Sequence, residues 1–242
     1  MRLASDIRLE PSRRQRTPAA VSATRGFLPI RQQRGPIAFE SSFERDLLVI
    51  CGATPQVLSV VREPFSIRFL EQRSGKDRVY TPDFLVSLRS GPIAELLVEV
   101  KRHEDERRYE LRDAARHDAA RLWAEQRQAR YFDVITDKWM TAVGLDQFRL
   151  IHAHAATRFD VVVAAEIVNE ISELGWLTTL SVCERLGAAS GLTWNRAMPM
   201  MLALVAAGQL RFDVRQALTL ESPIYAGSIP NPFDDLGSDE ST

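Results

Sequence analysis

The chain has 242 residues, enough for one large or two small domains. Its apolar fraction of 45%, charged fraction of 26% and net charge of −1 are ordinary for a globular protein and do not by themselves indicate nucleic-acid binding. No apolar run approaches the roughly 20 residues of a membrane span, the arginine-rich N-terminal region lacks the apolar segment of a secretory signal, and Cys51 and Cys183 form no zinc or disulfide pattern. We therefore expect a cytoplasmic protein with reduced thiols.

The first 35 residues are rich in arginine and carry no regular apolar pattern, which is typical of a flexible basic arm. Such an arm can bind DNA phosphates, or it can serve as a solubilising or partner-docking tail. Residues Phe39–Cys51 have the apolar spacing of a helix. Ser41 and Glu44 fit the S-x-x-E capping box at its start, so from pattern alone Glu44 is a structural cap.

Alternating apolar residues over Val57–Phe69 predict a strand, in which Pro64 marks a bulge or an edge. Two further apolar segments, Tyr80–Leu88 and Ile93–Lys101, flank the turn-forming residues from Ser90 to Pro92. Strand-forming segments on either side of such a turn predict a β-hairpin.

If this hairpin folds about Gly91, Asp83 and Glu99 are equidistant from the turn and lie opposite each other, roughly 5 Å apart at Cβ. Lys101 shares the face of Glu99, because side chains alternate along a strand. Adjacent carboxylates repel unless a cation lies between them, and hard oxygen ligands suit Mg²⁺. The alternatives are a solvated charged face, or a register slip of one residue that turns Asp83 to the opposite face.

A long charged helix is predicted over His103–Arg130, followed by a strand at Tyr131–Thr136. A strand, a helix and a strand in succession imply a right-handed parallel crossover. The fold class is therefore α/β, with a mixed sheet and the candidate site at one end of its central strands.

The composition becomes less charged from about Phe159, and the predicted elements change to short helices. Helices are expected at Phe159–Leu174, Thr178–Leu186 and Thr193–Ala207, followed by a hairpin of Gln209–Val214 with Gln216–Leu220. Helices followed by such a hairpin indicate a winged helix.

The last of these predicted helices is almost entirely apolar over Met198–Val205. It therefore suits a core or a protein partner better than base-specific DNA reading. The tail Ser222–Thr242 is acidic and is expected to be disordered, either inert or ordered by a partner.

The order of five segments resembles the TnsA-like endonuclease subunits of the heteromeric transposases of Tn7-like elements, which belong to the PD-(D/E)xK nuclease superfamily. The segments are SSFERDLL, VLSVVREPFSIRF, YTPDFLV, LLVEVK and YFDVIT, and the resemblance extends from about Phe39 to Val214. It implies a restriction-endonuclease-like mixed sheet flanked by helices, followed by a small winged-helix-like domain. The expected divisions are a basic arm at 1–35, the nuclease domain at 36–155, the winged-helix-like domain at 156–221 and the acidic tail at 222–242.

The resemblance also assigns roles to four residues, since such enzymes bring a glutamate from the helix before the sheet to the metal site. It implies that Asp83, Glu99 and Glu44 hold Mg²⁺, for which Mn²⁺ substitutes, and that Lys101 positions the attacking water. Glu40 and Asp46 are the alternatives to Glu44 if the alignment shifts.

The implied activity is hydrolysis of the 5′ strand at transposon ends, leaving a 5′-phosphate and a 3′-hydroxyl. The implied partners are double-stranded DNA, a DDE transposase (TnsB-like) that cuts the 3′ ends, and an AAA+ regulator (TnsC-like), in a complex on the bacterial nucleoid. Two other functions fit the same residues: a non-catalytic DNA-binding or assembly regulator, and a restriction or repair nuclease of the same superfamily.

Overall fold

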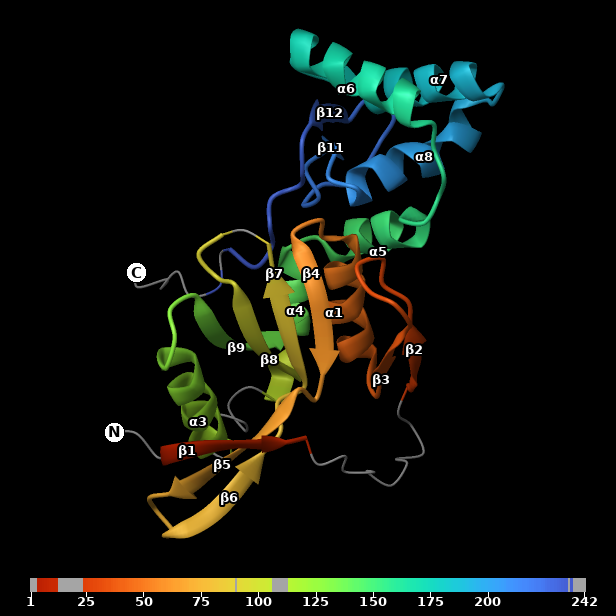
Figure 1. Ribbon diagram of the computed structural model, residues 1–242. Helices are drawn as coiled ribbons and strands as arrows, with labels where there is room; N and C mark the ends of the chain where they lie inside the picture. Colours follow the sequence, from red (N-terminus) through yellow and green to blue (C-terminus); the bar gives the residue numbers. More distant parts are fainter. Residues whose placement is uncertain (1–3, 13–23, 90, 106–112, 235, 237–242) are drawn as a thin grey trace. The chain divides into compact units, whose positions relative to one another are not determined.

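The computed structural model describes residues 4–12, 24–89, 91–105, 113–234 and 236 (Figure 1). These residues form two compact units, one within 1–45, 56–139 and 233–242 and the other within 46–55 and 140–232. The central part of the predicted basic arm, residues 13–23, lies outside the described residues.

A four-stranded mixed sheet forms the centre of the first unit (Figure 1). Its order is β4 (Val57–Arg62), β7 (Phe84–Leu88), β8 (Glu95–Lys101) and β9 (Arg130–Thr136). The first three strands pair antiparallel, and β8 pairs with β9 in parallel. Residues 96–100 of β8 are all buried, as in a strand covered on both faces. The predicted mixed α/β architecture is confirmed.

The hairpin of β7 and β8 has the register that the sequence predicts. Phe84 pairs with Val98 and Ser87 with Glu95, so the strands are symmetric about Gly91. Continuing this register by one pair brings Asp83 opposite Glu99. The alternative of a one-residue slip is therefore excluded.

A second sheet contains β1 (Ala4–Pro11), β5 (Phe65–Glu71) and β6 (Lys76–Tyr80), all antiparallel. The segment forming β1 is thus not part of a flexible arm. Its backbone extends the sheet beside β5, and Glu10 makes an ion pair with Arg68 at 2.5 Å. Side-chain pattern alone does not indicate this strand, because backbone pairing holds it.

Two predicted strands are each divided between the two sheets. The predicted strand Val57–Phe69 is wrong as one element: β4 ends at Arg62 and β5 begins at Phe65. Glu63 has a φ of 46° and its N–H donates to the carbonyl of Asp83 at 2.8 Å, and Pro64 has no N–H for a ladder. The segment Tyr80–Leu88 is divided in the same way, between β6 and β7.

The helix α3 (Ala114–Glu125) packs between the two sheets of this unit, in one apolar cluster with residues of both. Its Trp123 and Ala119 are fully buried there with Phe69 and Leu97. The predicted helix His103–Arg130 is too long. In the described residues a single 3₁₀ turn at His103–Asp105 precedes α3, and residues 106–112 lie outside the described part.

The remaining elements of the first unit are a small hairpin and the start of a helix. β2 (Gly26–Leu28) pairs antiparallel with β3 (Ile37–Phe39), which precedes α1 (Ser42–Ala53). Residues up to Arg45 of α1 belong to this unit and the rest to the other. The short helix α4 (Asp137–Ala142) is divided likewise, after Trp139.

The second unit is mainly helical. It contains α5 (Leu145–His154), α6 (Val161–Leu174), α7 (Thr179–Ser190) and α8 (Trp194–Ala206), with a sheet of order β10 (Leu177–Thr178), β12 (Pro223–Ala226) and β11 (Leu210–Arg211). Residues 200–206 of α8 are buried in this unit, which accounts for the apolar run in its sequence. None of the helices in the described residues has the length and apolar composition of a membrane span.

Two predictions for this unit are wrong in detail. The helix α7 continues past Gly187, where a Cβ would come within 2.6 Å of the Leu192 carbonyl oxygen. It ends at Ser190, and the next residue, Gly191, has a φ of 65°. The strand β11 pairs with β12, inside the predicted tail, and not with residues 216–220. The winged-helix assignment stays a prediction.

Candidate active site

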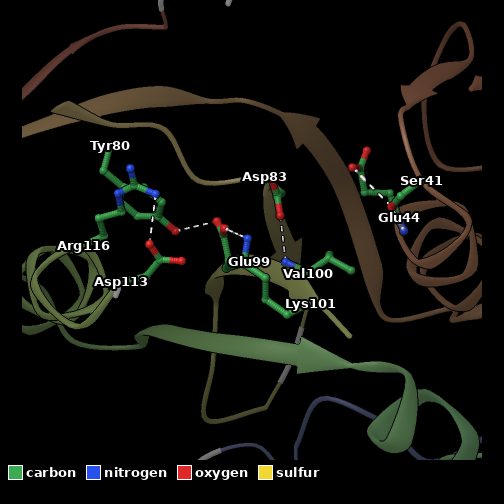
Figure 2. A network of polar contacts seen from close by, with 9 residues as sticks. All are labelled: Ser41, Glu44, Tyr80, Asp83, Glu99, Val100, Lys101, Asp113 and Arg116. Atoms are coloured by element: carbon green, nitrogen blue, oxygen red, sulfur yellow. Dashed lines mark hydrogen bonds and ion pairs between the residues drawn. The ribbon is translucent and has the colours of Figure 1, made fainter. Parts of the chain in front are cut away.

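The candidate site lies where the chain passes from β6 to β7, beside the end of β8. Thr81, Pro82 and Asp83 separate the two strands, so β6 ends at Tyr80 in one sheet and β7 begins at Phe84 in the other. The Val100 backbone N–H donates to Asp83 Oδ2 at 2.7 Å and holds this carboxylate against β8 (Figure 2). Glu99 and Lys101 come from β8 itself and alternate with the buried Val100.

Glu99 is buried, with only 7% of the residue exposed, and both of its carboxylate oxygens have partners. The hydroxyl of Tyr80 donates to Oε2 at 2.7 Å, and Lys101 Nζ lies 2.5 Å from Oε1. Figure 2 shows the phenol and the ammonium on either side of this carboxylate. The interactions fix the orientation of Glu99 from two strands, β6 and β8.

The electrostatics of the site are those of two acids sharing one ammonium. Burial, followed by repulsion from Glu99, raises the pKa of Asp83 well above its usual range. Burial and the same carboxylates raise the pKa of Tyr80. Burial opposes the charge of Lys101, but attraction to Glu99 and Asp83 is stronger in sum, and its pKa is raised. A further cation would therefore be favoured here.

Glu44 caps α1 and also lines the site. Glu44 N donates to Ser41 Oγ at 3.0 Å, and the Glu44 carboxylate accepts from Glu40 N at 2.9 Å and from the Ser41 hydroxyl at 3.4 Å. Burial raises the pKa of this carboxyl, against the lowering effect of the Glu40 N–H. Ser41 thus caps the Glu44 N–H as predicted, whereas the Glu44 carboxylate bonds the N–H of Glu40, one residue before the cap. Its surroundings favour neutralisation.

A cavity of about 330 Å³ brings Glu44 together with the predicted pair from the sheet. The carboxylates on its described lining are Glu40, Glu44, Glu63, Asp83 and Glu99, and the arginines are Arg62 and Arg116. Asp46, the other alternative to Glu44, is buried and pairs with Arg149 at 2.9 Å in the second unit. The structure therefore brings Glu44, Asp83 and Glu99 to one cavity, and Lys101 pairs with Glu99.

The donor types suit a hard divalent cation, although the side chains are not arranged as a complete ligand set. Among the described residues, no group of three or more His, Cys, Asp or Glu side chains is positioned to hold a metal ion. The hydrogen bonds explain this: Glu99 is engaged by Tyr80 and Lys101, Asp83 by Val100 N, and Glu44 by the helix start. Coordination would require these carboxylates to exchange partners, and their oxygen chemistry and excess negative charge fit such an exchange.

Tyr80 and Arg116 both line the site, and neither has an assigned role in the sequence analysis. Tyr80 directly precedes the Thr-Pro-Asp segment, but its bond to Glu99 depends on the division between the sheets. Arg116 is one of many charges in a mixed-sign segment, and nothing local distinguishes it from its neighbours.

Comparisons with known proteins find similarity to TnsA-like endonucleases. A family model described as TnsA-like endonuclease N terminal matches residues 54–137, which include Asp83, Glu99 and Lys101 but not Glu44. The chain is 26% identical over 150 residues to the transposon Tn7 transposition protein TnsA of Escherichia coli, covering 58% of this chain and 51% of that protein. The chain thus spans about half the length of the curated relative it matches. These findings confirm the resemblance to TnsA-like endonucleases that the ordered segments indicate.

Proposed function

We propose that this chain is a metal-dependent DNA endonuclease that hydrolyses the 5′ strand at transposon ends. The observation that carries the proposal is the pairing of Asp83 and Glu99 at the end of a mixed sheet, with Lys101 on Glu99. The similarity of residues 54–137 to TnsA-like endonucleases supports the same activity.

Asp83 and Glu99 would hold the metal, and Glu44 would complete or support the site after leaving its cap. When bound, Mg²⁺, or Mn²⁺ in its place, supplies activation of water and neutralises charge on the scissile phosphate. Tyr80 would keep its hydrogen bond to Glu99 Oε2 when the metal binds, because its hydroxyl approaches from the neighbouring sheet. This bond would hold Glu99 oriented toward the site.

Lys101 acts as an ammonium and not as a base. In the metal-free site its raised pKa keeps it protonated at neutral pH, since the charges of Glu99 and Asp83 outweigh the effect of burial. An ammonium donates hydrogen bonds, so Lys101 orients the attacking water and offsets negative charge that develops on the phosphate.

The similarity to a Tn7 transposition protein supports the partners that we propose. We infer that the substrate is double-stranded DNA at transposon ends, cut together with a DDE transposase (TnsB-like) under an AAA+ regulator (TnsC-like). The complex would work in the bacterial cytoplasm, at the nucleoid. Site choice would then come from the transposase.

The test is cleavage of labelled transposon ends, with and without the neighbouring transposase. Asp83→Ala and Lys101→Ala should abolish 5′-strand cutting while the proteins remain folded. Asp77→Ala and Lys76→Ala are matched controls, because both residues are exposed on β6 and neither lines the cavity. If Asp83→Ala cuts as well as the parent, the site assignment is wrong.

A further inference from the structure

Arg116 is a cation on the wall of the candidate active site that the reaction described above does not use. It lies in the first turn of α3, and its side chain lines the same cavity as Asp83 and Glu99. Figure 2 shows its guanidinium beside Tyr80 and Asp113, on the opposite side of Glu99 from Asp83. Arg116 therefore lines the cavity on the side of Glu99 away from Asp83.

Asp113 holds this guanidinium in place without covering it. Arg116 Nη1 donates to Asp113 Oδ1 at 3.1 Å, and the Asp113 side chain is only 3% exposed whereas that of Arg116 is 53% exposed. A guanidinium is a rigid planar fork of five N–H donors. A buried acid on one part of the fork fixes its direction and leaves the rest accessible.

The other arginine of the described lining is differently placed. Arg62 Nη2 bridges Glu40 at 3.2 Å and Glu63 at 3.0 Å, and its side chain is 23% exposed. Both acidic partners of Arg62 line the cavity, whereas Asp113, the partner of Arg116, is not part of the described lining. The cavity is rich in carboxylates, so an anionic DNA strand needs an accessible cation here. Arginine suits this purpose because it binds phosphate oxygens in bidentate fashion.

We propose that Arg116 binds a phosphate of the scissile strand inside the cavity, with Asp113 as its positioning residue. The inference rests on the proposed function, since it takes DNA as the substrate. It adds a contact outside the carboxylate and lysine set, and it gives α3 a part in holding the strand.

The experiment measures binding of the full chain to a fluorescent duplex carrying the transposon end, over a series of salt concentrations. Arg116→Ala should weaken binding about 10-fold, as expected for loss of one charge-assisted contact. The slope of log K against log salt should become shallower by about 0.9, the contribution of one neutralised phosphate. Arg116→Lys should keep the slope and recover part of the affinity, because the charge remains but the fork does not.

Arg121→Ala is the matched control. Arg121 lies on the same helix and pairs with Asp118 three residues before it, at the same 3.1 Å, with a side chain that is 58% exposed. It does not line the cavity, so its removal should leave both affinity and slope unchanged. The double variant Asp113→Asn/Arg116→Ala also removes the charge of Asp113 and should show the same loss as Arg116→Ala.

The outcomes separate this assignment from the proposed function. If the parent binds and cuts DNA but Arg116→Ala keeps the parental affinity and slope, only the role of Arg116 is wrong. An equal loss in Arg121→Ala would also refute it, since the effect would then come from the general charge of α3. A folded parent that binds no duplex even at low salt would overturn both.

Discussion

Replacing Tyr80 by Phe isolates the hydrogen bond that orients Glu99. The ring of Tyr80 is 5% exposed and packs in the apolar cluster with Phe69 and Leu97, so phenylalanine keeps the packing and removes only the hydroxyl. The lost bond is 2.7 Å long and ends on a buried carboxylate. Hydrogen bonds to charged groups contribute about 1.5–3 kcal/mol net, and we expect a loss of about 2 kcal/mol in the free energy of unfolding.

Urea unfolding of the metal-free protein, followed by circular dichroism, measures this loss. The raised pKa of Tyr80 keeps the phenol protonated through neutral and mildly alkaline pH, so the cost should not change across that range. Tyr225→Phe is the control, since that ring lies over Arg211 at 5.2 Å on the small sheet of the second unit and should cost under about 0.5 kcal/mol. A Tyr80→Phe protein as stable as its parent would refute the reasoning.

Three further results are expected. Asp83→Asn should stabilise the metal-free protein by about 1 kcal/mol at pH 7, because it removes a buried carboxylate that repels Glu99. The folded-state pKa of Asp83 is raised, so the penalty is complete above that pKa, shrinks as the pH falls below it, and is gone only below the pKa of an unfolded aspartate. A constant difference in pH-dependent melting would contradict the account. Glu44→Gln keeps an oxygen for the Glu40 N–H, so it should keep the helix start but reduce cleavage if Glu44 is a ligand; full cleavage would leave Glu44 as a cap alone. Burial raises the pKa of Cys183 to about 11, so at pH 8 only about 0.1% is thiolate and a thiol reagent should label it only on unfolding; rapid labelling of the native protein would show that the second unit opens.

The register of the β7–β8 hairpin could be predicted because its causes are local. A turn at Gly91 and alternation on either side are enough to bring Asp83 opposite Glu99. The cap at Ser41 and Glu44 is likewise local, since its atoms lie within one turn of helix.

The positions of Tyr80 and Arg116 could not be predicted, because they depend on contacts between segments distant in sequence. Tyr80 reaches Glu99 only because the chain changes sheets between Tyr80 and Phe84. Arg116 reaches the cavity only because α3 packs against both sheets through its small and aromatic residues. The strand β12 pairs with two strands far from it in the sequence, and its own four residues do not indicate those partners.

Calorimetric titration of the folded, metal-free chain with Mn²⁺ tests the central claim most directly, namely that Asp83 and Glu99 form a divalent-cation site. The account predicts saturable binding to the parent and to Asp77→Ala, and none to the double variant Asp83→Ala/Glu99→Ala. Undiminished binding by that double variant, or no binding by the folded parent, would contradict it.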